Sequence, residues 1–388
     1  MPDRPAAARG AVPASAPAAA RTAAPAPATT TARTAAPASR LPGSPGRPRS
    51  PFLAQLDDPA RTLDARPRPT PCVLLLSRAC DTDLDPVRNL LAGAGIRTAR
   101  LNAEELAATS LTIAPDVRTV RLNGRELTPT VTWIRHFAPT ALDPAAYDPA
   151  VLDRPALDPA GTPRGAFLRD SWQAAAAQLA AISGTAVRPD RPGVLCQLDL
   201  ARRYGIAAPR AVLTTDPHLV RDEFDGPRVV VKAAGHHFVE PVPGRLHGIF
   251  PTVLDRADLA GGPRPGPPVI VQEYVEHEAE LRVYFVGGHL HAFEVTKTAP
   301  ADPWTAPDRL GVRALPSPPP AVAAATRTLA AAMSLRYGAF DFLLSAGTPV
   351  FLEVNPDGDW RWAERRTRTT PVTVAVAAML AALHRAAL

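Results

Sequence analysis

The feature that most constrains the fold is a pair of apolar segments close to the carboxyl end of the chain. The first is residues 338–344, Gly-Ala-Phe-Asp-Phe-Leu-Leu, and the second is residues 351–356, Phe-Leu-Glu-Val-Asn-Pro. Short apolar runs with a brief glycine-containing connection predict two antiparallel strands, joined by a five-residue loop at 345–349. The aromatic and aliphatic residues on both segments predict that one face of this hairpin is buried.

Three oxygen-bearing side chains are expected on the other face of the hairpin. If Leu344 pairs with Val350, the register places Asp341 directly opposite Glu353. Side chains alternate along a strand, so Glu353 and Asn355 share a face. Carboxylate and amide oxygens suit Mg²⁺, especially an ion that is also held by phosphates. The pattern predicts a metal site, and the alternative is a solvated polar face of an edge hairpin.

The composition limits the class of protein. The chain has 388 residues, 46% of them hydrophobic, which is enough for two or three domains. The net charge of +6 resides in the first 70 residues, which contain ten Arg and four Asp, so a nucleic-acid-binding fold has little support. No run approaches the roughly 20 apolar residues of a membrane span. Three cysteines without Cys-x-x-Cys spacing argue against a disulfide framework or a zinc site, and they favour the cytoplasm.

Residues 1–69 differ in composition from the rest of the chain. They are dominated by Ala, Pro, Thr, Ser and Arg, with no apolar periodicity. Such a segment buries too little surface to offset its ordering entropy, so we predict a disordered arm. Whether this arm binds a partner or is a dispensable extension stays open.

Residues 70–184 carry the pattern of a small α/β domain with a linker helix. A buried-strand signal, an amphipathic helix and a second short strand follow one another, which is the start of a β-α-β unit. Asn123-Gly124 is a strong two-residue hairpin signal. The expected elements are strands at 72–77, 98–101 and 131–137, a hairpin over 109–127, and helices at 84–94 and 165–183.

Residues 185–388 are expected to form a larger domain, so the chain belongs to the α/β (α+β) class. Glycine- and proline-rich stretches at 235–248 and 298–320 predict loops. The other expected elements are helices at 194–204, 321–335 and 370–387 and strands at 210–215, 229–232, 269–275, 280–286 and 289–295, besides the hairpin.

Lys232 is a candidate phosphate ligand. It ends an apolar strand and precedes a glycine-containing loop, whose backbone N–H groups and the ammonium can together hold phosphate oxygens. Strand-end lysines are usually only solvated. However, the chain has just two lysines, Lys232 and Lys297, so a compact point charge is retained here where arginine serves elsewhere.

Two further strands carry candidate nucleotide contacts. The segment Gln272 to Val275 ends a strand, and a strand-end backbone can donate to and accept from the edge of an adenine ring. Glu280 and Arg282 lie on one face of the next strand, where they suit a ribose hydroxyl and a phosphate oxygen. A cross-strand salt bridge, worth about 0–1 kcal/mol if exposed, is the equally supported alternative.

Taken in order, these signals resemble the ATP-grasp superfamily. The stretch 351–364, Phe-Leu-Glu-Val-Asn-Pro-Asp-Gly-Asp-Trp-Arg-Trp-Ala-Glu, is similar to the carboxyl-terminal signature of microviridin- or graspetide-type peptide maturases. The likeness covers 185–388 and, more loosely, the preceding domain through its Trp-Ile-Arg strand at 133–135. The resemblance implies an ATP-grasp fold with a small α/β pre-ATP-grasp domain.

The resemblance also implies a role for each candidate residue. Two Mg²⁺ ions would be bound by Asp341, Glu353 and Asn355. ATP would be held by Lys232 at the phosphates, by Gln272, Glu273, Tyr274 and Val275 at the adenine and by Glu280 at the ribose, while Arg282 would serve phosphoryl transfer together with Lys232. The family activates Asp or Glu side chains of a precursor peptide as acyl phosphates and forms ω-ester or ω-amide cross-links. It also implies a homodimer.

Two alternatives and several departures accompany this hypothesis. The chain could be a ligase for a free amino acid or small peptide, or a non-catalytic nucleotide-binding partner. ATP-grasp ligases usually have a lysine at the position of Val194, for which Arg191 or Arg202 would have to substitute. The pair His236-His237 is unusual, and the segment Asp302-Pro-Trp304 lacks the arginine of a similar family motif, for which Arg309 and Arg313 are candidates.

Overall fold

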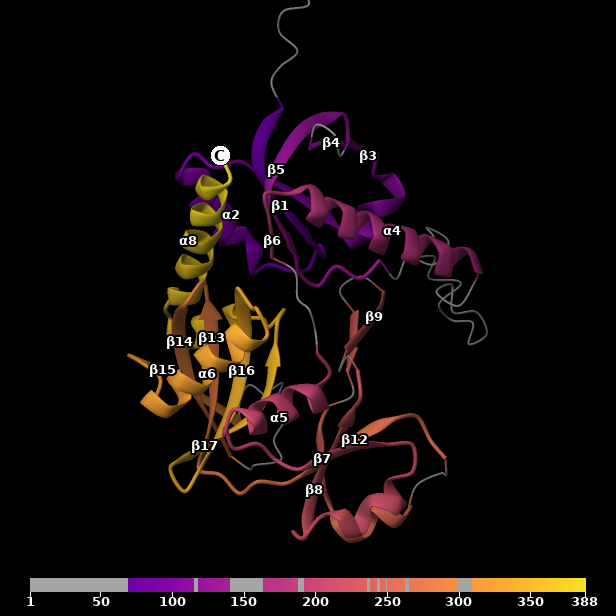
Figure 1. The fold of residues 1–388 in the computed structure, drawn as a ribbon, viewed down its shortest axis with the longest axis vertical. Coiled ribbons are helices and arrows are strands. Elements are labelled where there is room, and N and C mark those ends of the chain that lie inside the picture. Colours follow the sequence, from indigo (N-terminus) through magenta and orange to yellow (C-terminus); the bar gives the residue numbers. More distant parts are fainter. Residues whose placement is uncertain are drawn as a thin grey trace, which may run out of the picture. The chain divides into compact units, whose positions relative to one another are not determined.

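The computed structural model describes nine ranges of the chain, namely residues 69–114, 118–139, 163–187, 192–235, 238–242, 245–248, 250–261, 265–298 and 309–388. The arm predicted at 1–69, the pair His236-His237, Arg191 and the segment 302–304 lie outside these ranges, apart from residue 69. The described residues form four sheets, of six, four, five and two strands, with helices packed on them (Figure 1). Among the described residues, no helix is long and apolar enough to cross a membrane.

The first sheet is mixed and has six strands. Its order is β2-β1-β5-β4-β3, with β6 also paired to β5, and β1 is parallel to both β2 and β5. The two-residue turn Asn123-Gly124 joins β4 to β5 with both residues at positive φ, which confirms the predicted hairpin signal. The elements are β1 (Thr70–Ser77), α2 (Leu84–Gly93), β2 (Thr98–Asn102), η1 (Ala103–Ala108), β3 (Leu111–Ala114), β4 (Thr119–Leu122), β5 (Arg125–Ile134), α4 (Pro163–Ile182) and β6 (Thr185–Val187).

The second sheet is antiparallel and has four strands in the order β11-β8-β12-β7. One of its faces packs on a small apolar cluster that includes Phe224, Val229, Leu259 and Val271. The short pair β9 and β10 lies where the sequence predicted only a glycine-punctuated loop. The elements are β7 (Ala211–Thr214), η4 (Pro217–Glu223), β8 (Arg228–Ala233), β9 (Phe238–Val242), β10 (Arg245–Gly248), β11 (Thr252–Asp255), η5 (Arg256–Gly261) and β12 (Val269–Glu273).

The third sheet is antiparallel and has five strands in the order β15-β14-β13-β16-β17. One face packs on α5 and α6 through an apolar cluster of phenylalanine and aliphatic side chains. The strand β15 and the short helix α7 are absent from the sequence prediction. The elements are α5 (Val194–Arg203), β13 (Ala279–Val286), β14 (His289–Lys297), β15 (Leu310–Leu315), α6 (Pro320–Ala332), β16 (Tyr337–Ser345), β17 (Thr348–Asn355), α7 (Arg361–Thr367) and α8 (Pro371–Ala386).

The first and third sheets share one apolar core. The carboxyl-terminal helix α8 runs beside α2 (Figure 1) and buries Val376 and Leu380 in a cluster with Val73 and Trp133 of the first sheet and Phe293 of the third. The amino-terminal α/β unit therefore completes its core with residues from the end of the chain, about 300 residues later in sequence than β1.

The predicted hairpin forms, but its turn is tighter than expected. Ser345 pairs with Thr348, so the loop is the two-residue Ala346-Gly347 and not five residues. Both loop residues have positive φ, 48° and 74°, as a type I′ turn requires. Leu344 consequently faces Pro349, and the predicted pairing with Val350 is wrong.

A β-bulge restores the predicted register further along the hairpin. The pairing shifts between Phe342–Phe351 and Asp341–Glu353, which leaves Leu352 as one extra residue on β17. Asp341 therefore does lie opposite Glu353, as predicted. Without this bulge, the register set by the turn would place Asp341 opposite Leu352.

Candidate active site

Polar side chains form a row across the third sheet. Arg282 on β13 pairs in register with Asp341 on β16, which pairs with Glu353 on β17. Directly paired residues project from the same face of a sheet, so these three side chains lie side by side. The Arg282 Nε is 3.1 Å from Asp341 Oδ1. Asn355 is two residues beyond Glu353 and extends the row on the same face.

The carboxyl group of Asp341 has a strongly shifted pKa. Its burial raises its pKa to about 7, and the negative charges of Glu353 and Glu280 add to this effect, while Arg282 and Lys232 oppose it. Its Oδ1 is buried, and among the described residues it meets Arg282 in an ion pair without the geometry of a hydrogen bond. A divalent cation would relieve this concentration of negative charge, and two carboxylates with one amide oxygen are a donor set that suits Mg²⁺.

Lys232 reaches this row from the second sheet. Its Nζ lies 3.2 Å from Glu353 Oε2, and only 6% of its side chain is exposed. The lysine therefore is not merely solvated at a strand end. The contact brings Lys232 of β8, in the second sheet, against Glu353 of β17, in the third, so cations and carboxylates of the two sheets lie together.

The predicted adenine segment divides into residues with different surroundings. Gln272 is 4% exposed and shares a sheet face with Lys232, because it pairs with Val230 in β8. The Glu273 carboxylate instead accepts the backbone N–H of Arg210 at 3.1 Å, beside the outer strand β7. Of these two side chains, only Gln272 faces the site. Glu273 could therefore contact a nucleotide only through its backbone.

The ring of Tyr274 and its neighbour Val275 lie just beyond β12. The Arg228 guanidinium stacks on the Tyr274 ring at 4.1 Å from its centroid. The Val275 carbonyl contacts His277 Nδ1 at 2.8 Å. Both residues are half-buried and belong to the connection between the second and third sheets.

Glu280 pairs with two cationic groups that sequence reasoning did not connect to it. Lys297 Nζ is 2.6 Å from its Oε1, and His277 Nε2 is 3.4 Å away. The hydrogen bond with Glu280 is the largest cause of the raised pKa of His277. Lys297 is one of only two lysines in the chain, and this rarity is the sequence signal that points to it as well as to Lys232.

Helix α5 begins at Val194. Its Gln197 side chain faces β17, the edge strand of the site. Its side-chain amide accepts the Val354 N–H at 2.7 Å and donates to the Val354 carbonyl at 3.2 Å. Gln197 thus covers the backbone of the edge strand β17 between Glu353 and Asn355. The guanidinium of Arg202, one of the two suggested substitutes for the expected lysine, donates to the Pro209 carbonyl.

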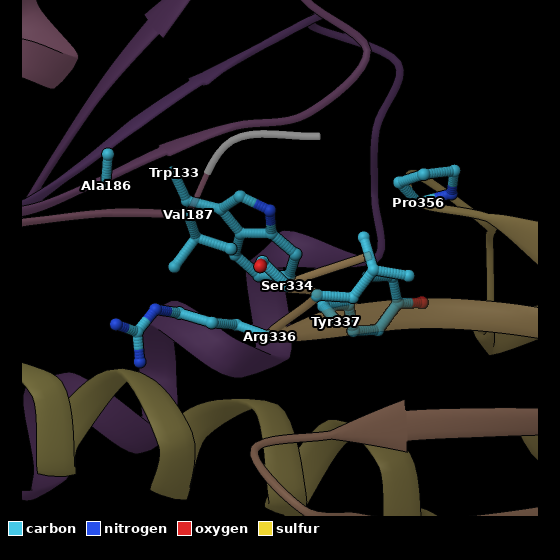
Figure 2. Close-up of a pocket in the computed structure, with 8 residues that line it drawn as sticks. Trp133, Ala186, Val187, Ser334, Arg336, Tyr337 and Pro356 are labelled. Atoms are coloured by element: carbon cyan, nitrogen blue, oxygen red, sulfur yellow. The ribbon is translucent and has the colours of Figure 1, made fainter. Parts of the chain in front are cut away.

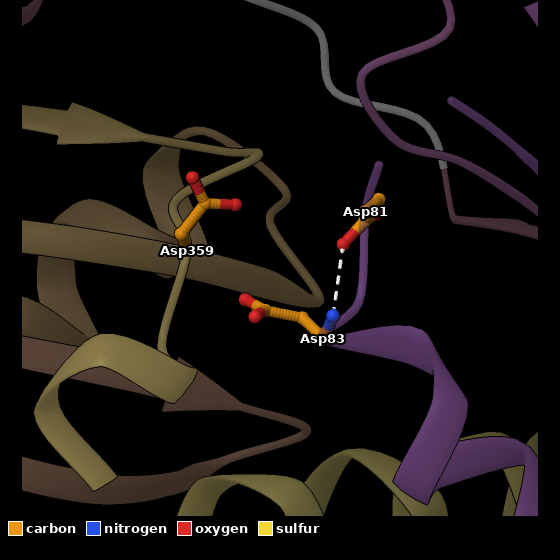
Figure 3. Close-up of side chains that lie close together, drawn as sticks. All are labelled: Asp81, Asp83 and Asp359. Carbon is orange, nitrogen blue, oxygen red and sulfur yellow. Dashed lines mark hydrogen bonds between the residues drawn. The ribbon is translucent and has the colours of Figure 1, made fainter. Parts of the chain in front are cut away.

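A second charged cluster surrounds Arg135, and it has a structural explanation. Arg135 is 1% exposed and forms ion pairs with Asp81, Asp83 and Asp359. Figure 3 shows Asp81 and Asp83, which precede α2, approaching Asp359 of the carboxyl-terminal signature. Burial alone would raise the pKa of Asp359, but the hydrogen bond with His136 and the charge of Arg135 hold it well below its usual range. The guanidinium therefore supplies the countercharge that a metal would otherwise supply.

The Trp-Ile-Arg strand and the carboxyl-terminal signature meet in this cluster. The Trp133 and Trp360 rings are stacked with centroids 6.3 Å apart, and Arg135 lies 4.6 Å from the Trp360 ring centroid. The backbone N–H of Trp360 donates to Asp83 Oδ2 at 3.0 Å. A Cβ on Gly358 would lie 2.3 Å from the Ala339 Cβ, so glycine is required there. The signature residues beyond Asn355 join the first and third sheets.

The same cluster also orients Asn355. The Asp357 N–H donates to Asn355 Oδ1 at 3.0 Å, and Asp357 Oδ2 accepts the His136 N–H at 3.3 Å. An amide oxygen has two lone pairs, so Asn355 Oδ1 retains one for a metal.

A small pocket lies beside this junction but does not include the predicted site. It has a volume of about 40 Å³, far below the roughly 300 Å³ of a typical ligand pocket. Figure 2 shows it between Trp133 and Val187 of the first sheet and Tyr337 and Pro356 of the third.

No protein-family model and no curated protein matches the sequence significantly. Solved structures do match. The macrocyclase MdnC of Microcystis aeruginosa MRC, bound with precursor peptide MdnA, is 18% identical and matches over 80% of this chain and 99% of its own, with a TM-score of 0.64.

Two further structures match with a TM-score of 0.60. The Chryseobacterium gregarium RiPP-associated ATP-grasp ligase, in complex with ADP and a leader and core peptide, is 19% identical over 81% of this chain and 97% of its own. The ATP-grasp ligase PsnB, complexed with a phosphomimetic variant of minimal precursor, Mg and ADP, is 18% identical over 81% of this chain and 99% of its own. The chain therefore has the ATP-grasp fold, as its sequence predicted.

Proposed function

We propose that this protein is an ATP- and Mg²⁺-dependent ligase that cross-links side chains of a ribosomally made precursor peptide. The observation that carries the proposal is the row of Arg282, Asp341 and Glu353 on the third sheet, with Lys232 of the second sheet against it. It combines cations for phosphate oxygens with oxygen ligands for a metal, as transfer of a phosphoryl group requires. The three structures described above are complexed with precursor peptides, and two of them also with ADP, which supports the same substrates here.

Each predicted residue has a place in this proposal. Mg²⁺ would be held by Asp341, Glu353 and Asn355, and it would neutralise charge on the phosphate oxygens. Lys232 and Arg282 would bind the phosphates, and Glu280 the ribose hydroxyls. The adenine would lie against Gln272 and the backbone of 273–275.

The proposed reaction has two steps. A carboxylate oxygen of a peptide Asp or Glu attacks the γ-phosphorus of ATP, which forms an acyl phosphate and releases ADP. A Thr or Ser hydroxyl, or a Lys amine, then attacks the acyl carbon, phosphate leaves and the attacking group loses its proton. The product is an ω-ester or ω-amide with one water removed per cross-link. Because the reaction consumes ATP, we expect it in the cytoplasm, with a homodimer as the expected assembly.

The ion pairs of the candidate active site indicate what the residues of this chain contribute to the proposed reaction. In the ligand-free state, Arg282 contacts Asp341 and Lys232 contacts Glu353. When the carboxylates ligate a metal, both cations become available to phosphate oxygens. Positioning and charge neutralisation are the main requirements of phosphoryl transfer, so no further nucleophile from the protein is needed.

The test uses the purified full chain with ATP, Mg²⁺ and a Thr/Asp/Glu-rich candidate precursor peptide. The expected result is the loss of one water per cross-link in the peptide mass, with one ADP released each time. Mild alkaline hydrolysis would then reverse ester bonds but not amide bonds. ADP release with free amino acids, and none with the peptide, would instead identify a small-molecule ligase. Nucleotide-dependent stabilisation without any ADP release would identify a non-catalytic partner.

A further inference from the structure

The two lysines of the chain lie in the same site. They are the only lysines among the 43 Lys and Arg residues, yet each has its ammonium group against a carboxylate of the candidate active site. Lys297 is the last residue of β14, its side chain is 13% exposed, and its Nζ is 2.6 Å from Glu280 Oε1. A point charge on a flexible stem is thus retained twice in one place, in a chain that otherwise uses arginine.

The register places Lys297 on the same face as the other site residues. Glu280 pairs with Val295 on β14, and Lys297 follows two residues later, so its side chain projects from the same side of the sheet. The polar row therefore begins at Lys297, one strand further than sequence reasoning placed it, and continues to Glu353 on β17.

Charges alternate along the extended row. Three ion pairs follow one another, namely Lys297–Glu280, Arg282–Asp341 and Lys232–Glu353. An anionic nucleotide with its metal can enter such a balanced row only by exchanging partners. Ribose hydroxyls at Glu280 would release Lys297, in the same way that a metal at Asp341 and Glu353 would release the other two cations.

Helix α5 does not supply a cation from its first turn. Val194 stands at the start of α5, and the first turn of that helix contains no basic residue. Lys297 has the chemistry that is missing there, and its four-carbon stem permits movement of the ammonium group. His277 would remain beside Glu280 as a hydrogen-bond partner after Lys297 leaves.

We propose that Lys297 is a phosphate-binding residue of the nucleotide site. On nucleotide binding, its ammonium group moves from Glu280 to a phosphate oxygen. This inference rests on the proposed function only in so far as the candidate active site binds a nucleoside di- or triphosphate. It does not depend on which peptide or amino acid is the second substrate.

The experiment compares adenosine, ADP and AMPPNP binding to the full chain by titration calorimetry with Mg²⁺ present. Lys297→Met is expected to weaken ADP and AMPPNP binding by about 10- to 100-fold, the usual effect of losing a charge-assisted contact, and to leave adenosine binding unchanged. Lys297→Arg is expected to recover part of the loss, because it keeps the charge. Arg121→Met is the matched control, since it removes one positive charge from an exposed ion pair on β4.

Three results would overturn the inference. The first is binding of ADP by Lys297→Met within about twofold of the wild type. The second is an equal loss for adenosine and ADP, since Lys297 would then only position Glu280 at the ribose. The third is a wild-type chain that binds no nucleotide, which would overturn the proposed function as well. A wild type that binds ADP but modifies no peptide would affect the proposed function alone.

Discussion

Lys232 Nζ lies 3.2 Å from Glu353 Oε2, although the two residues are 121 positions apart in the sequence. The pair joins the second sheet to the edge strand of the third. In the proposed reaction this contact has to open, because Glu353 is then needed by a metal and Lys232 by phosphate. The ligand-free protein thus holds both groups in place with their charges balanced.

Glu353→Gln should abolish Mg²⁺-dependent ADP release and leave the fold intact. The amide removes the negative charge that a metal requires, so we expect Mg²⁺–nucleotide affinity to fall by at least about 10- to 100-fold, the effect known for outer partners of metal sites. Calorimetry with Mg²⁺–ADP and thermal unfolding of the ligand-free protein measure the two effects. Glu126→Gln at the start of β5 is the control. An active Glu353→Gln enzyme would contradict the assignment of Glu353 as a metal ligand.

Gln197→Met should destabilise the protein through the edge strand β17. The change removes two hydrogen bonds to Val354 and leaves its backbone groups buried without partners, at an expected cost of about 2–4 kcal/mol. Urea unfolding measures this loss. Asp199→Asn on the exposed side of the same helix should change the free energy of unfolding by less than about 0.5 kcal/mol. Equal effects of the two substitutions would show that the Gln197 contacts are unimportant.

Arg135→Met should strongly destabilise the union of the first and third sheets. It leaves the carboxylates of Asp81, Asp83 and Asp359 without their shared cation, which should cost about 3–5 kcal/mol. Adding Asp81→Asn removes one uncompensated charge, so the double variant should be more stable to urea than Arg135→Met alone. A double variant that is less stable than the single one would contradict this account of the cluster.

His136 should make the protein less stable below about pH 6.5. Burial lowers its pKa, the charge of Arg135 lowers it further, and Asp359 only partly opposes this. The unfolded state therefore takes up a proton first, near the ordinary value of about 6.5. The free energy of unfolding is highest above that pH and falls as the pH drops through the folded pKa.

Urea unfolding between about pH 7 and pH 5 checks this expectation. His136→Gln cannot titrate, so its free energy of unfolding should depend less steeply on pH than that of the wild type. His289→Gln, at the exposed start of β14, is the matched control. An unchanged slope in His136→Gln would assign the acid sensitivity to other groups.

Local patterns identified many of the elements. Apolar runs, glycine positions and the Asn123-Gly124 turn were sufficient to place the strands and helices around the site to within a few residues. They failed where the pattern is short or polar, as at β15 and α7. The hairpin illustrates the limit, because Asp341 was correctly placed opposite Glu353 from a wrong turn, and the bulge at Leu352 compensated for the difference.

The sequence alone determined the order of the site residues along the chain and, through strand alternation, which of them share a face. Only the tertiary structure decided their partners. Lys232 with Glu353 and Arg135 with Asp359 are pairs between segments that no local pattern relates. The physical reason is that alternation is a property of one strand, whereas an ion pair depends on how separate sheets pack, which buried apolar side chains far from the charges decide.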